Sequence, residues 1–417
     1  MLSILTRNKL VKETAWSFLA KGISAIFFIG LNVFLARYLG PARFGTWSYF
    51  YSILSIILLL SYFGINGAAR KYLAQFNNTD QLGAILKSSI KIRVFYSFLF
   101  AVVFLCLHRL LATILNRPDF ELLFRTALPL IFLAGLVDFF KHAFEGLHRL
   151  KYAFIVTLFE HSLKLIITIT ALLFINGLIT IIYSFNLVFF VTAIIGSYFY
   201  YYHFYKNNRV GLERFELDIL KYSLPLFLVS IGFAVAVELD VLMIGILSVD
   251  SEVGIYAVAK QIIVKLPHLA LAIALGTMPV FAQLNSSNKT ELIKLFQKLL
   301  ITNSYVFGFI GLFLLTTSWF FIPLIFGEEY TASVAPLMIL ICYLLLFSYS
   351  IFLSSLLDYQ GMAAKRAVNL IITIALNILL NTLLIPRYGA IGAAIGTSVS
   401  YMPYVFLNWL EVRKILL

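Results

Sequence analysis

The sequence predicts an all-α integral membrane protein with about twelve transmembrane helices, and two observations lead to this fold class. The chain is 61% apolar and only 12% charged, with a mean hydropathy of +0.95, whereas soluble domains are about half apolar and a quarter charged. The apolar residues also form continuous runs of about 20 residues, the length that crosses a bilayer as a helix. A transmembrane barrel would show ten-residue alternating strands instead.

Twelve apolar runs are long enough to span the bilayer, and polar loops too short to fold into a domain connect them. The predicted spans are 14–37, 44–66, 90–114, 122–146, 152–175, 178–204, 220–247, 253–282, 297–325, 332–357, 364–386 and 389–412.

The net charge of +13 has a topological explanation. If the N-terminus lies inside, most lysines and arginines fall in loops on the cytoplasmic side, which is the positive-inside pattern. Both termini are therefore predicted to be cytoplasmic, and nucleic acid is not expected as a partner. The expected partners from this pattern are membrane lipids.

Nothing in the chain predicts an enzyme, a metal site or a cofactor. Motifs such as HExxH, Walker A and GxSxG are missing from the sequence. Cys106 and Cys342 each lie inside an apolar run without disulfide or metal spacing, as small core residues do. We therefore predict no catalytic residues, no metal ligands and no cofactor.

The two halves of the chain repeat. Phe44-Gly45 opens the second predicted span, and Val253-Gly254 opens the eighth. Six spans per half give both halves the same topology, which predicts lobes of residues 1–210 and 211–417. Such lobes are expected to be related by a pseudo-twofold axis along the membrane normal, around a central cavity.

Several segments together resemble the multidrug/oligosaccharidyl-lipid/polysaccharide (MOP) flippase superfamily, in particular its polysaccharide transport branch with the Wzx-type O-antigen flippases. The segments occur in the family order and cover nearly the whole chain. They include LARYLGPARFGTWSY (35–49), FGINGAARKYLA (63–74), ELDVLMIGILSVDSEVGIYAVAKQI (238–262), GTMPVFAQL (276–284), FGEEYTASVAPLMIL (326–340) and LLNTLLIPRYGAIGAAIGTSVSY (379–401).

The resemblance implies a flippase in the bacterial inner membrane. It would move a polyprenyl-pyrophosphate-linked oligosaccharide, such as an O-antigen repeat unit for lipopolysaccharide, from the cytoplasmic to the outer leaflet by alternating access. Coupling to Na⁺ or H⁺ and contact with the polysaccharide polymerase machinery are part of this expectation. In the family, the first two spans of each lobe line the cavity.

Charged side chains inside the bilayer are costly and mark candidate functional sites. Lys21 and Asn32 lie on nearly one face of the first span, since eleven residues make about three helical turns. On the hairpin of spans seven and eight, Asp240 and Lys260 are predicted at equal depth and hence as an ion pair. Lys260 is a candidate for binding the substrate. Glu238 and Asp240 are either ion-coupling residues, for a cation or a proton, or members of a structural ion pair.

Two further basic residues are candidates for binding the pyrophosphate. Lys265 lies about 7.5 Å deeper than Lys260 along the helix, and no acid is predicted at its depth. Arg70 ends the second span on the cytoplasmic side, where it either recruits the head group or only fixes the topology. Lysine suits a ligand that must be released, because it is a mobile point charge.

Two alternatives remain open from the sequence. A cation-coupled multidrug or metabolite antiporter of the same superfamily would favour acids over lysines in the cavity. A membrane-embedded polysaccharide polymerase or glycosyltransferase would need a sizeable extracytoplasmic loop, and the longest one here, around 109–125, is short.

Overall fold

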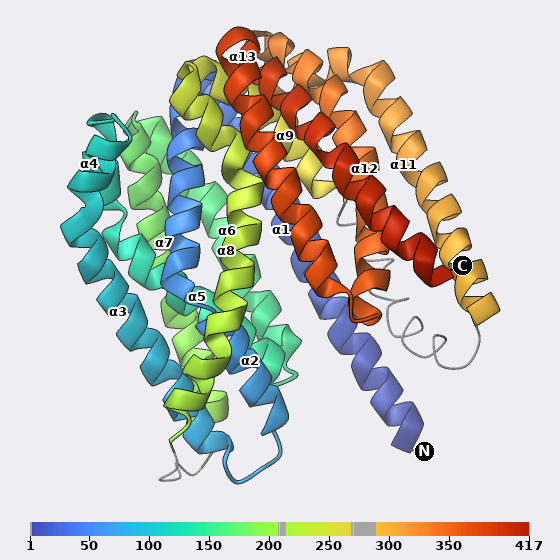
Figure 1. Cartoon of the computed structure of the whole chain (residues 1–417). Coiled ribbons are helices and arrows are strands. Elements are labelled where there is room, and N and C mark those ends of the chain that lie inside the picture. Colours follow the sequence, from blue (N-terminus) through green and yellow to red (C-terminus); the bar gives the residue numbers. More distant parts are fainter. Residues whose placement is uncertain (1, 207, 209–213, 268–269, 271–288, 417) are drawn as a thin grey trace. The chain divides into compact units, whose positions relative to one another are not determined.

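The computed structural model describes residues 2–206, 208, 214–267, 270 and 289–416, and every regular element in these ranges is a helix. Figure 1 shows the long helices of the chain. They are α1 (Leu2–Tyr62), α2 (Ile65–Gln75), α3 (Leu82–Ile114), α4 (Asp119–Thr126), α5 (Leu128–Gly146), α6 (Leu150–Phe174), α7 (Leu178–Tyr200), α8 (Glu216–Leu247), α9 (Asp250–Lys265), α11 (Lys289–Phe326), α12 (Val334–Tyr359) and α13 (Ala363–Leu416), with the short turns η1 (Tyr201–Tyr205) and η2 (Glu328–Ser333).

Within the described ranges, eight helices are long and apolar enough to cross a membrane, or nine if the bent pair α4–α5 counts as one span. Helices α1 and α13 have 61 and 54 residues, more than twice the length that one span needs. Each is broken at a glycine with positive φ, Gly40 (70°) and Gly389 (51°). Each therefore covers two predicted spans, and the all-α membrane fold class is confirmed.

The predicted eighth span, 253–282, is described only in its first part. Helix α9 ends at Lys265, and Pro267 follows in a turn. Residues 271–282 lie outside the described residues.

Large apolar side chains cover the outer faces of these helices. Phe98 on α3, Phe174 on α6 and Phe309 on α11 are 63%, 88% and 71% exposed. A soluble protein would not tolerate so much exposed apolar surface, whereas hydrocarbon chains solvate it well. The exposure pattern is that of helices surrounded by lipid.

By internal contacts the chain divides into two compact units. Unit 1 comprises residues 1–34 and 50–237, and unit 2 comprises residues 35–49 and 238–417. The predicted division into two six-helix lobes, 1–210 and 211–417, stays a prediction, as does their relation by a pseudo-twofold axis.

Unit 1 contains a fully buried arginine. The guanidinium of Arg93 on α3 donates hydrogen bonds to the carbonyl oxygens of Ser61 (2.7 Å) and Tyr62 (3.2 Å) and to Ser97 Oγ. These carbonyls lie at the end of α1, where the chain turns through Phe63 and Gly64 with positive φ. Helix ends leave carbonyls unpaired, and Arg93 satisfies two of them inside the unit.

Unit 2 is held by close contacts between backbones. A Cβ atom on Gly254 of α9 would lie 2.1 Å from the Pro41 carbonyl oxygen, and one on Gly45 would lie 1.6 Å from that of Asp250. The repeated glycines of the two halves thus pack against each other's segments. In α13 likewise, a Cβ on Gly392 would lie 2.5 Å from the Leu384 carbonyl oxygen, so the two halves of that helix pack closely after the break at Gly389.

Candidate functional site

The acids and lysines of α8 and α9 pair differently from the sequence prediction. Lys260 Nζ lies 2.9 Å from Glu238 Oε2, and both side chains are mostly buried. The predicted pairing of Lys260 with Asp240 is therefore wrong. Residues 238 and 240 lie about 200° apart around a helix, so only one of them faces Lys260. The equal depth of Asp240 and Lys260 along the hairpin did not show which of the two acids faces Lys260.

Asp240 is instead the centre of a buried hydrogen-bond network, and its exposed fraction is 6%. Its Oδ2 accepts a hydrogen bond from the Tyr256 hydroxyl at 2.8 Å. Its Oδ1 accepts from the side-chain amides of Asn381 (2.9 Å) and Asn377 (3.2 Å). Among the described residues, no lysine or arginine lies within 4 Å of this carboxylate.

A second layer of polar atoms surrounds the Asp240 network. Thr397 Oγ1 and Ser400 Oγ lie 3.5 Å and 3.4 Å from the amide nitrogen of Asn377. Asn381 Oδ1 is buried and has no hydrogen-bond partner among the described residues. A buried carboxylate needs a counter-charge or a proton. A single carboxylate surrounded by amide and hydroxyl oxygens can bind a monovalent cation or a proton.

The sequence reasoning missed Asn377, Asn381, Tyr256 and Thr397 because they carry no charge. A signal was present: two asparagines four residues apart, on one face of a span that is otherwise apolar. Buried asparagines in apolar helices need hydrogen-bond partners. At a spacing of four residues both side chains lie on the same helix face, so both can reach a single partner, here Asp240.

Lys265 is the last residue of α9 and is partly buried. It lies five residues beyond Lys260 on the same helix, which places the two Cα atoms about 7.5 Å apart along the helix axis. Both basic residues belong to unit 2, together with the Asp240 network.

The remaining predicted site residues lie in unit 1. Lys21 on α1 is exposed, and Asn32 Nδ2 donates to the Phe28 carbonyl oxygen of its own helix at 2.8 Å. Arg70, in the middle of α2, forms an ion pair with Glu145 at 3.1 Å, with both side chains more than a third exposed. The structure thus joins none of these three to another predicted site residue within the described part of unit 1.

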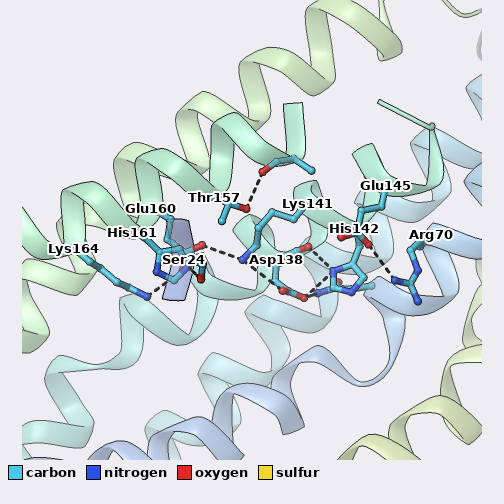
Figure 2. Close-up of polar contacts among 12 residues, drawn as sticks. Ser24, Arg70, Asp138, Lys141, His142, Glu145, Thr157, Glu160, His161 and Lys164 are labelled. Atoms are coloured by element: carbon cyan, nitrogen blue, oxygen red, sulfur yellow. Dashed lines mark hydrogen bonds and ion pairs between the residues drawn. The ribbon is translucent and has the colours of Figure 1, made fainter. Parts of the chain in front are cut away.

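Unit 1 contains a larger buried charge cluster, shown in Figure 2. Glu160 on α6 is 4% exposed. Its two carboxylate oxygens accept from Lys141 on α5 and Lys164 on α6, each at 3.0 Å. One acid therefore holds two lysines. The favourable i, i+4 spacing of Glu160 and Lys164 is realised as an ion pair.

The cluster extends through Asp138 on α5. Its carboxylate accepts from Asn66 at 2.6 Å and lies 3.3 Å from the ring nitrogen of His142 and 3.8 Å from Lys141. At the other end, the His161 ring shares a hydrogen bond of 2.8 Å with Ser24 of α1. Two acids balance two lysines here, so the cluster is neutral when both histidines are neutral and positive when they are protonated.

A family model described as "Polysaccharide biosynthesis protein" matches residues 10–285. This is more than half of the chain. The chain belongs to the polysaccharide biosynthesis protein family. The sequence resemblance to a polysaccharide transport branch agrees with this family model. The eight or nine described helices that are long and apolar enough to span a bilayer make the chain a multi-pass membrane protein.

Two curated relatives are similar in sequence to this chain. An uncharacterised membrane protein of Methanocaldococcus jannaschii is 25% identical over 416 residues, covering 95% of each chain. The "probable low-salt glycan biosynthesis flippase Agl15" of Haloferax volcanii is 28% identical over 190 residues, which are 44% of this chain and 39% of the relative.

Solved structures share the fold. An inward-facing multidrug resistance MATE transporter of the MOP superfamily superposes with a TM-score of 0.78 at 14% identity, over 94% of this chain and 95% of the other. The lipid II flippase MurJ, in an inward closed conformation, gives a TM-score of 0.73 at 14% identity, over 97% and 89%. At this identity the likeness establishes the fold and leaves the cargo open.

Proposed function

We propose that this protein is a flippase for a lipid-linked oligosaccharide whose head group is a polyprenyl pyrophosphate. The observation that carries the proposal is the pair of lysines on α9, Lys260 and Lys265, inside a predicted membrane span. Membrane-embedded lysines are costly, and an anionic cargo gives them a purpose. Family membership and the similarity to a glycan biosynthesis flippase support the same cargo class.

The pyrophosphate site that we propose lies in unit 2. Lys260 forms an ion pair with Glu238. A phosphate oxygen of the cargo would replace the Glu238 carboxylate as the partner of Lys260. Lys265, farther along α9, would bind the second phosphate. Ammonium–phosphate hydrogen bonds are strong in a site of low dielectric, while the competing carboxylate keeps them exchangeable. Release of the cargo then requires only that Glu238 recovers its partner.

We further propose that Asp240 binds the coupling ion, Na⁺ or H⁺. The carboxylate has neutral hydrogen-bond donors and no basic partner within 4 Å among the described residues. Rotation of the two asparagine amides would turn their oxygens toward a cation beside Asp240. Glu238 is assigned to the lysine rather than to the ion.

The location and movement follow from the same proposal. Both termini lie in the cytoplasm of a bacterial cell, the protein resides in the inner membrane, and two lobes alternate to carry the head group outward. An O-antigen repeat unit for lipopolysaccharide is the cargo that we propose first, with delivery to the polysaccharide polymerase machinery. Lys21, Asn32 and Arg70 remain candidates for head-group binding in the first lobe.

The test measures cell-surface glycan in a host strain that lacks its own flippase. Lys265→Ala is expected to abolish glycan display while the protein remains in the membrane at normal amount. Lys298→Ala, which changes an exposed lysine on α11, is the matched control and should display glycan normally. Normal display with Lys265→Ala would remove this residue from the site.

The rival function is a cation-coupled multidrug or metabolite antiporter, which the fold likeness to a MATE transporter favours. In that case Asp240 would bind a cationic cargo. Purified protein in liposomes distinguishes the two. A flippase translocates a fluorescent polyprenyl-pyrophosphate sugar and leaves ethidium where it is, and the opposite result would establish the antiporter.

A further inference from the structure

Three segments of unit 2 enclose an apolar groove of about 350 Å³. Leu300 of α11, Leu346 and Tyr349 of α12, and Met402, Phe406 and Trp409 of α13 line it. The volume is at the lower end of the range for small-molecule sites, about 300–1,000 Å³. The groove is therefore large enough to hold part of a ligand, and its lining selects an apolar one.

The α13 side of the groove is a stripe that ends in a positive charge. Met402, Phe406 and Trp409 follow the spacing of one helix face and are 46%, 57% and 43% exposed. The next position on this face is Arg413. Its guanidinium carbon lies 5.6 Å from the centroid of the Trp409 ring, so the cation stands at the end of the groove.

Arg413 differs from the basic residues around it. Lys365 and Lys414 each lie 2.8 Å from an oxygen of Glu411, and Arg366 pairs with Asp358 at 3.0 Å. Arg413 is exposed and has no carboxylate within 4 Å among the described residues. It is therefore available to an anion from outside the protein.

The distance from the start of the stripe to Arg413 also matches one leaflet. Eleven residues separate Met402 and Arg413, a rise of about 16.5 Å, against about 15 Å for half of the hydrocarbon core. Tryptophan is typical of the membrane interface, where lipid head groups begin. An acyl chain in the groove would thus place its phosphate at the level of Arg413.

We infer that this groove binds an anionic phospholipid of the leaflet on the side of the chain's C-terminus. One acyl chain lies along Met402, Phe406 and Trp409, and the phosphate contacts Arg413. Positive clusters at the ends of membrane helices select anionic lipids in this way. The site does not depend on the flippase cargo, and it would persist if the protein carried something else.

Quenching of tryptophan fluorescence tests the site, because bromine on an acyl chain quenches an indole that it contacts. The protein is placed in phosphatidylcholine vesicles with a small fraction of lipid brominated along its chains, either phosphatidylglycerol or phosphatidylcholine. Brominated phosphatidylglycerol is expected to quench more strongly. Trp409→Phe, which keeps an aromatic ring beside Arg413, should abolish this difference.

Two further variants assign the selectivity to the cation. Arg413→Gln should weaken the apparent affinity for phosphatidylglycerol about fivefold, the effect of one basic residue at a membrane surface. Lys151→Gln, which removes an exposed lysine of α6 in unit 1, should change nothing. Equal quenching by both lipids, or wild-type affinity in Arg413→Gln, would overturn the site. Stronger competition by a polyprenyl phosphate than by phosphatidylglycerol would overturn the choice of ligand.

Discussion

The close contact around Gly254 gives a prediction that can be worked from the structure. In Gly254→Ala, the new methyl group would lie 2.1 Å from the Pro41 carbonyl oxygen and 3.2 Å from the backbone nitrogen of Gly45. Ordinary van der Waals contact begins near 3.4 Å, so the two segments must separate by about an ångström. Because the obstacle is backbone, a side-chain rotation cannot relieve it.

Two opposing effects set the magnitude for Gly254→Ala. Alanine in a helix gains about 1 kcal/mol over glycine. Overpacking of this kind costs about 1–3 kcal/mol, and backbone overlap belongs at the upper end of that range. We expect a net destabilisation of about 1–2 kcal/mol, which corresponds to a fall in melting temperature of about 2–8 °C for a unit of this size.

The assay is thermal unfolding of the purified protein in detergent, followed by intrinsic fluorescence. The matched control is Gly308→Ala on α11, where a Cβ would meet no atom within 4 Å. This variant is expected to unfold at the wild-type temperature or slightly above it. If Gly254→Ala were as stable as Gly308→Ala, α9 and the segment around Pro41 would not pack in this way.

Three other predictions concern charged side chains. Asp240→Asn keeps the shape of the network but removes the charge, so flipping in liposomes should fall at least tenfold and lose its dependence on a Na⁺ or pH gradient; retained ion dependence would move the coupling site elsewhere. Glu160→Gln leaves the buried Lys164 without its acid and Lys141 with only the longer contact to Asp138 (3.8 Å). It should destabilise the protein by about 3–5 kcal/mol, measured by thermal unfolding, and adding Lys164→Met should restore part of the loss. Arg93→Met strips two buried carbonyls of their donor and should cost about 3 kcal/mol in the same measurement, whereas a wild-type melting temperature would mean that water replaces the guanidinium.

Several features of the fold could be read from the sequence for a simple physical reason. Apolar runs of the right length must be helices in lipid, so the all-α membrane class did not depend on any tertiary contact. The paired glycines near residues 45 and 254 also stood out, because only glycine permits two backbones to approach so closely. The sequence did not show that these two glycines pack against each other's segments.

Candidate site residues were harder to predict than the fold. Membrane charges are rare, so Lys260, Lys265, Glu238 and Asp240 were recognisable as unusual from their positions alone. Their pairing was not recognisable. Depth along a hairpin is fixed by the sequence positions of the residues, but the rotation of each helix about its axis is fixed by packing. This rotation pairs Lys260 with Glu238 and directs Asp240 toward two asparagines.

The sequence by itself determined that this protein spans a bilayer, that its membrane spans are helices, and that a few charged residues lie within those spans. Hydrophobicity and helix length are local properties, so no contact was needed to read them. Only the tertiary structure decided that Arg93 donates to the carbonyls at a helix end, that Glu160 pairs with two lysines, and that Asp240 lies among neutral donors. Those roles depend on which residues from distant helices meet, and helix packing alone settles that.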